Sequence, residues 1–209
     1  MRIPSIFIGF IVLVFLAAAC GGLGGAEKRY NAGVDLQEQG ALDEAIAEYD
    51  EAIRLDPEFA VAYNKRGSAY YQFGQPQRAI QDFEEAIRLD PEFALAYANR
   101  GGALGQLGQP QQAIQDFDEA TRLDPDLALA YSNRGAAFGE LGQPQRAIQD
   151  YDEAIRIDPG FALAYANRAF VYTVLGNDAA AQQDIDRAVE LGFDRDWLDQ
   201  IIRQIIDQR

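Results

Sequence analysis

The chain has 209 residues, of which 33 are acidic and 18 are basic, so its formal net charge at pH 7 is −15. Such a chain is repelled by phosphate backbones, which makes nucleic acid an unsuitable partner. It contains no histidine and one cysteine, Cys20, which excludes a histidine base, a zinc site built from cysteines and an intrachain disulfide. Carboxylates are plentiful, but no segment suggests the desolvated pair that acid–base catalysis needs. We therefore expect no enzyme activity, no metal site and no cofactor.

The first 20 residues have the layout of a secretory signal. Arg2 provides a short positive start, residues 6–16 are almost wholly apolar, and small residues follow up to Cys20. The end of this segment resembles the lipobox of bacterial lipoproteins, although Ala17 stands where that family usually has leucine. The resemblance implies cleavage before Cys20, lipidation of its thiol, export from the cytoplasm and attachment to a membrane of the cell envelope.

Two alternatives to lipidation are open at this point. Residues 3–20 are a little shorter than the roughly 20 apolar residues of a spanning helix, but they could stay attached as a signal anchor. Plain cleavage would instead leave Cys20 as a free thiol. In each case we expect residues 21–25, which are rich in glycine, to form a flexible tether to the folded body.

From residue 26 onward the sequence repeats with a period of 34 residues. A fixed period in this range indicates stacked supersecondary structures. The recurring residues are Pro57, Pro91, Pro125 and Pro159; Tyr63, Tyr97, Tyr131 and Tyr165; Gly33, Gly67, Gly101 and Gly135; and Ala45, Ala79, Ala113, Ala147 and Ala181. The five repeats cover residues 26–59, 60–93, 94–127, 128–161 and 162–195.

Each repeat is predicted to form two helices. In residues 60–93, Gly74 favours a left-handed end to the first helix. Pro76 follows at a position where a helix begins, because the first turn needs no amide donor there. Pro91 prevents the second helix from continuing.

Small and large residues alternate between the two predicted helices. Gly67 and Ala79 are expected where the helices approach closely, beside the ring of Phe83. Interlocking of small and large side chains is how helix pairs reach native packing density. Because one hairpin cannot bury both of its faces, each repeat is predicted to pack on the next.

This pattern resembles the tetratricopeptide repeat (TPR) family over residues 26–195. The resemblance implies an all-α fold, a right-handed solenoid of about five helix-turn-helix repeats. It also implies a scaffold or adaptor that binds other proteins. The terminal repeats depart from the pattern, with Arg29 in place of tyrosine in the first, and Ala169 and Ile185 in place of glycine and an aromatic ring in the fifth.

Residues 196–209 are predicted to form a capping helix. Its apolar residues recur along one side, where they would cover the fifth repeat. They are Trp197, Leu198, Ile201, Ile202, Ile205 and Ile206. The alternative is a docking surface through which copies of the chain associate, which would make the protein a self-assembling structural component of the envelope.

In the TPR family, the first helices of successive repeats line a concave groove that holds extended peptide segments. By register, the resemblance implies a polar row and an apolar row of site residues. The polar row is Asn64, Lys65, Asn99, Asn133 and Asn167, with Asn64 one position early in its repeat and Lys65 at the matching place. The apolar row is Val61, Leu95, Leu129 and Leu163.

A row of carboxamides, which resembles the asparagine ladder of a TPR groove, suits an extended partner. Each carboxamide has donors and an acceptor, so the row can pair with a peptide backbone of almost any sequence. Recent duplication explains the regular asparagines equally well, because segments 74–101 and 142–169 differ at few positions.

Arginines and aspartates also follow the period. The arginines are Arg66, Arg100, Arg134 and Arg168, and the aspartates are Asp82, Asp116 and Asp150. The arginines could bind carboxylates of a partner, but we expect them to pair with these aspartates, because a partly buried guanidinium needs a close partner. Family members that bind acidic C-terminal tails use lysines in the groove. Lys65 is the only lysine at those positions, so such a receptor is not predicted.

Overall fold

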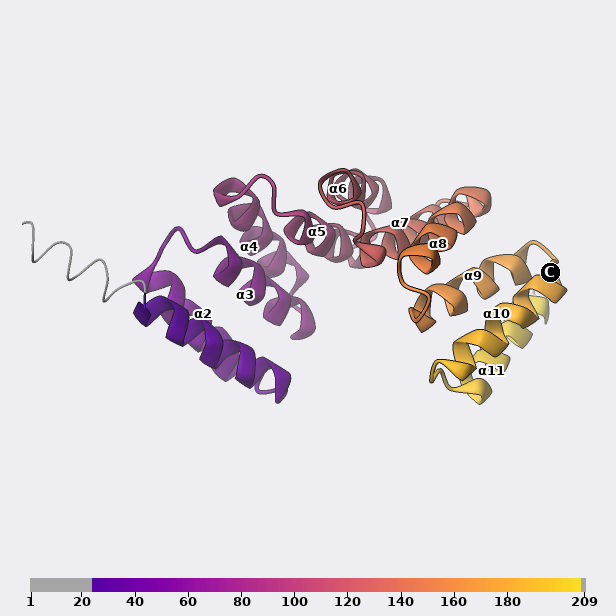
Figure 1. Cartoon of the computed structure of the whole chain (residues 1–209), viewed down its shortest axis with the longest axis horizontal. Coiled ribbons are helices and arrows are strands. Elements are labelled where there is room, and N and C mark those ends of the chain that lie inside the picture. Colours follow the sequence, from indigo (N-terminus) through magenta and orange to yellow (C-terminus); the bar gives the residue numbers. More distant parts are fainter. Residues whose placement is uncertain (1–23, 208–209) are drawn as a thin grey trace, which may run out of the picture. The chain divides into compact units, whose positions relative to one another are not determined.

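The computed structural model describes residues 24–207, and every regular element in this range is an α-helix (Figure 1). The all-α prediction is therefore confirmed. The predicted signal segment with Cys20, residues 21–23 of the tether and the last two residues of the cap lie outside the described residues. Gly24 and Gly25, which were predicted to belong to the flexible tether, are instead part of the first helix. Within residues 24–207, no helix has both the length and the hydropathy that crossing a membrane requires.

The chain divides into two compact units. The first unit contains helical residues 24–38, α2 (Leu42–Leu55), α3 (Ala60–Gln72) and α4 (Pro76–Leu89). The second unit contains α5 (Ala94–Gln106), α6 (Pro110–Leu123), α7 (Ala128–Glu140), α8 (Pro144–Ile157), α9 (Ala162–Val174), α10 (Asp178–Glu190) and α11 (Arg195–Asp207). The helices pair as hairpins, α3 with α4 in the first unit, and α5 with α6, α7 with α8 and α9 with α10 in the second.

Proline, glycine and aspartate set the helix boundaries. A proline occupies the first turn of α4, α6 and α8, as expected from its position in the sequence. The helix before α4 ends near Gly74, whose φ is 77°, a conformation that favours glycine. After α2, the Oδ1 atom of Asp56 accepts a hydrogen bond of 3.1 Å from the amide of Glu58. This turn leads the chain into α3.

The hairpin cores combine a small residue with a large one, as predicted. A Cβ atom added to Gly101 would lie 2.7 Å from a ring carbon of Phe117, so the close approach of α5 and α6 requires glycine there. In the α9/α10 hairpin, Ala169 and Ile185 are both buried in one cluster. The extra methyl group of Ala169 is accommodated because Ile185 stands where the other hairpins have a larger aromatic ring.

Helix α11 caps the last hairpin, and it packs against α9 and α10. Leu198 is fully buried in the cluster of the α9/α10 hairpin. The Trp197 ring centroid lies 6.0 Å from those of both Phe170 and Phe193. The capping role is confirmed for Leu198, but Trp197 and Ile206 are 48% and 43% exposed. Some apolar side chains of α11 are therefore not covered by the rest of the described chain.

Candidate functional site

The second unit brings together six of the predicted site residues. Helix α5 contacts α7, and α7 contacts α9. Each of these helices carries a leucine that is 37–40% exposed and, four residues later, a partly exposed asparagine. We call this surface the first-helix face, which consists of Leu95, Asn99, Leu129, Asn133, Leu163 and Asn167. A spacing of four residues places each leucine and its asparagine on the same side of their helix.

Beyond each asparagine, the residues on the same side of the helix differ between the repeats. On α5 the next position is Gly102, where an added Cβ atom would meet no other atom within 4 Å. On α9 the corresponding residue is Phe170, whose ring centroid lies 6.0 Å from that of Trp197, and one turn later Val174 is 57% exposed. Beyond the asparagine, this side therefore presents open backbone at Gly102 on α5 and an exposed apolar side chain at Val174 on α9. Helical spacing in the sequence could have indicated these positions.

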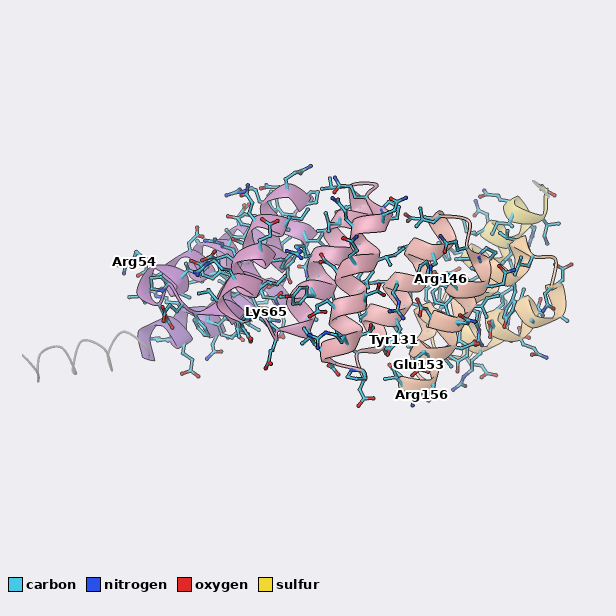
Figure 2. The ribbon with its side chains drawn as sticks, turned by 90° about the horizontal axis from the view of Figure 1, so that it is seen from above. Arg54, Lys65, Tyr131, Arg146, Glu153 and Arg156 are labelled. Atoms are coloured by element: carbon cyan, nitrogen blue, oxygen red, sulfur yellow. The ribbon has the colours of Figure 1, made fainter. Side chains whose placement is uncertain are left out.

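In the first unit, Val61 and Lys65 lie on α3. Val61 is 38% exposed. Lys65, labelled in Figure 2, lines a cavity of about 220 Å³ together with Val34, Gln37, Glu38 and Gln72. The structure thus places both residues at a surface that a ligand can reach.

The burial of Asn64 contradicts its predicted place in the polar row. Its side chain is only 2% exposed, and the equivalent residues Ala98, Ser132 and Ala166 are buried as well. Successive helical residues are about 100° apart, so the residue before the row points away from the exposed side. Asn64 therefore belongs to the packed interior of the first unit.

The polar row has a further member that the sequence prediction missed. Asn31 stands 34 residues before Lys65, on helical residues 24–38, and its side chain is exposed. It lines a cavity of about 390 Å³ in the first unit. The 34-residue period could have identified it, because counting back once from Lys65 gives Asn31.

The arginine row binds aspartates, as predicted. Arg134 donates from Nε and Nη2 to the carboxylate of Asp150, at 2.9 and 2.7 Å, and from Nη1 to Asp118 on the preceding hairpin at 2.7 Å. Similar pairs within the units are Arg66 with Asp82 and Asp50, Arg100 with Asp116, and Arg168 with Asp184 and Asp152. The guanidinium carbon of Arg134 also lies 5.3 Å from the ring centroid of Tyr131.

These contacts assign the arginines to the scaffold. Arg134 is mostly buried, and its side chain is 17% exposed. The hydrogen bonds to Asp150 raise the pKa of Arg134 above its usual value despite the opposing effect of burial. The carboxylates of α6 and α8 therefore hold this guanidinium, and it is not directed at a partner. Within residues 24–207, no group of three or more acidic side chains is placed to hold a metal ion.

Three protein-family models match the sequence. A model described as TPR repeat matches residues 33–74, and two described as tetratricopeptide repeat match residues 64–126 and 128–161. A comparison with curated proteins found no match.

Solved structures also resemble the chain. MamA is 30% identical, with 76% of this chain and 93% of that protein covered and a TM-score of 0.65. YrrB, described as a TPR protein with an unusual peptide-binding site, is 26% identical, with 84% and 90% covered and a TM-score of 0.63. PilF from Pseudomonas aeruginosa shares the fold, at 18% identity, with 90% of both chains covered and a TM-score of 0.77.

Proposed function

Because the chain belongs to the tetratricopeptide repeat family, whose members are generally protein-interaction scaffolds, we propose that it binds an extended segment of a partner protein on the first-helix face. The observation that carries this proposal is the repetition of an exposed leucine and a partly exposed asparagine on α5, α7 and α9, where α7 contacts both of the other helices. YrrB, a TPR protein reported to have an unusual peptide-binding site, supports a peptide as the class of ligand.

The proposed contacts follow from the spacing of the helices. Neighbouring packed helices lie about 8–10 Å apart, which is the length of about three residues of an extended chain. Asn99, Asn133 and Asn167 would therefore meet the partner backbone at about every third residue. Each carboxamide can donate to a carbonyl and accept from an amide. The leucines beside them would contact the partner's apolar side chains.

The role is proposed to be non-catalytic. The chain has no histidine, so nucleophile–base pairs that use a histidine base are absent from the sequence. The proposed action is to hold a partner and bring it to a complex.

Site-specific crosslinking tests this proposal. A photoreactive amino acid replaces Leu129 on the first-helix face, and in a matched variant it replaces Gln115, which is exposed on α6. We expect the Leu129 variant to form an adduct with a partner that mass spectrometry identifies, and the peptide in the adduct to be an extended segment. Equal adducts from both positions would contradict binding at this face.

We also propose that the protein is a lipoprotein of the cell envelope, anchored through Cys20. The order of the positive start, the apolar residues 6–16 and the small residues before the cysteine supports this. Wild-type protein from a bacterial membrane should begin at Cys20 and carry lipid, and Cys20→Ser should prevent this maturation. An intact mass that still includes residues 1–19 in the wild-type protein would overturn the lipoprotein proposal.

A second candidate function is self-assembly through α11. The observation that favours it is that Trp197 and Ile206, two of the apolar residues of α11, are 48% and 43% exposed. Sedimentation of the purified protein over a range of concentrations distinguishes the two functions. Self-assembly predicts a mass that rises with concentration and that falls to the monomer value in Trp197→Ser.

A further inference from the structure

The cavity of about 390 Å³ in the first unit has an unusual combination of walls. It is lined by Glu27, Tyr30, Asn31, Asp56 and Phe59. Two of these residues are carboxylates, two are aromatic, one is a carboxamide, and none is basic. The volume falls within the range of small-ligand pockets. The chemistry of the lining is that of a site for an organic cation.

The two rings are placed by packing within the first unit. The ring centroids of Tyr30 and Phe59 are 5.3 Å apart with an interplanar angle of 47°. On its other side, Tyr30 lies 6.1 Å from the ring of the buried Tyr49. Because both rings are partly buried, the aromatic wall is formed before any ligand arrives.

The two carboxylates have no cationic partner among the described residues. Glu27 is exposed, and Asp56 is partly buried with Oδ1 bound to the amide of Glu58. Within residues 24–207, neither of the two forms an ion pair. Arg29, two residues after Glu27, binds Glu48 at 3.1 Å instead. The cavity therefore has uncompensated negative charge beside an aromatic surface.

Duplication of the repeat does not account for this cavity. Residues equivalent to Glu27 in the other repeats are apolar, namely Val61, Leu95, Leu129 and Leu163. Those equivalent to Tyr30 are Asn64, Ala98, Ser132 and Ala166. A carboxylate and an aromatic ring at these two positions occur together in the first repeat alone.

We propose that this cavity binds a cationic side chain of the partner segment, with the guanidinium group of arginine as the best fit. A guanidinium is planar, so it stacks on an aromatic face while its N–H groups donate to carboxylates. Glu27 and Asp56 supply the negative charge, and the Asn31 carbonyl can accept a further hydrogen bond. This inference rests on the proposed peptide binding for the source of the side chain, but the cavity lies in the first unit and is testable by itself.

The test is a nuclear magnetic resonance titration of the isotope-labelled full chain with Nα-acetylarginine amide. Nα-acetylcitrulline amide, which has nearly the same shape and no charge, is the control ligand. We expect saturable shifts in the amide signals of residues 27–31 and 56–59 with the arginine compound, and binding of the citrulline compound at least fivefold weaker. Equal binding of the two compounds, or shifts spread evenly over the acidic surface, would overturn the proposal.

A pair of variants distinguishes binding of the arginine compound in the cavity from its general electrostatic attraction to an acidic protein. Glu27→Gln should weaken binding of the arginine compound at least threefold. Asp35→Asn, which removes one charge from an exposed position on the same helical residues 24–38 outside the cavity, should leave binding unchanged. Equal weakening in both variants would contradict a specific site. Neither result affects the crosslink at Leu129, so failure of this inference is distinguishable from failure of the proposed function.

Discussion

Adjacent glycines in α5 have opposite surroundings. Gly101 faces the ring of Phe117, and an added Cβ atom there would lie 2.7 Å from a ring carbon. The same atom added to Gly102 would meet nothing within 4 Å. One glycine is therefore required by packing, whereas the other lowers helix stability without a packing reason within the described chain.

Alanine substitutions of this pair should have opposite effects. Gly101→Ala should destabilise the protein, because the buried Phe117 ring has to shift. Gly102→Ala should stabilise it by about 0.5–1 kcal/mol through higher helix propensity. Urea unfolding of both variants gives the two free energies. Similar changes of the same sign would show that the helix packing described above is wrong.

Enlarging a buried alanine tests the same close approach from the second helix. Ala113 on α6 has no exposed surface. Ala113→Leu should overpack the contact and cost about 1–3 kcal/mol of the free energy of unfolding. Gln111→Leu on the exposed side of α6 is the control and should be nearly neutral. Equal melting temperatures for the two variants would contradict the register.

A buried tyrosine should make stability depend on alkaline pH. Burial raises the pKa of the Tyr151 hydroxyl above its ordinary value near 10. The Tyr151 hydroxyl therefore ionises at a lower pH in the unfolded chain than in the folded protein. Its contribution to the free energy of unfolding is fully present below pH 10 and is lost as the pH rises further. Tyr151→Phe should lose less stability than the wild type between pH 9 and 11, measured by urea unfolding at each pH. Phenylalanine should fit at position 151, because the buried residues Phe83 and Phe117 occupy the equivalent positions in two other repeats.

The exposed Tyr71 provides the control for the alkaline experiment. Tyr71→Phe removes the same kind of hydroxyl group from a residue that is 38% exposed. If Tyr71→Phe and Tyr151→Phe gave identical pH profiles, burial of the Tyr151 hydroxyl would not be the cause.

At the scale of the helices, the arginine row joins neighbouring hairpins. Arg134 on α7 binds one aspartate on α6 and another on α8, and its side chain is 17% exposed. Removing it leaves Asp150, whose side chain is 9% exposed, without its partner. Arg134→Ala should therefore reduce the free energy of unfolding by about 3 kcal/mol.

A surface arginine is the matched control for this prediction. Arg156 pairs with Glu153 on the same helix at 2.7 Å, and both are labelled in Figure 2. Its side chain is 62% exposed, so water screens the pair. Arg156→Ala should produce no measurable change in thermal unfolding. Equal losses from Arg134→Ala and Arg156→Ala would show that the row does not hold the hairpins together.

The helices were predictable because short-range rules determine them. Prolines such as Pro76 mark where a second helix begins, and Gly74 has the positive φ expected at the end of a first helix. The pairing of Arg66 with Asp82 was also predictable, because both residues follow the 34-residue period and a buried charge needs a partner.

The site was only partly predictable because it depends on helix orientation and on contacts distant in sequence. Asn64 was assigned to the polar row, but a shift of one residue turns its side chain into the interior. The acidic cavity joins Tyr30 to Asp56 and Phe59, which stand in a later loop. No motif in the sequence connects these residues, because their proximity arises from the folding of the first unit.

The protein as a whole is proposed to bind an extended peptide on the first-helix face of its second unit. Apolar contacts are part of this proposal, since an exposed leucine accompanies each asparagine. Leu129→Asp should weaken binding of the partner segment, because it places a charge among apolar contacts. Calorimetric titration with a synthetic peptide of the crosslinked segment measures the change. Undiminished affinity would exclude the apolar row from the site.

The most direct test replaces Asn99, Asn133 and Asn167 together by alanine. Each lost hydrogen bond contributes about 0.5–1.5 kcal/mol, so the peptide should bind weaker by about 2–4 kcal/mol, while helicity and melting stay nearly unchanged. The control replaces three exposed glutamines that follow the same period, Gln81, Gln115 and Gln149, and should retain full affinity. If the asparagine variant also retains full affinity, the row reflects duplication alone and the claim is contradicted.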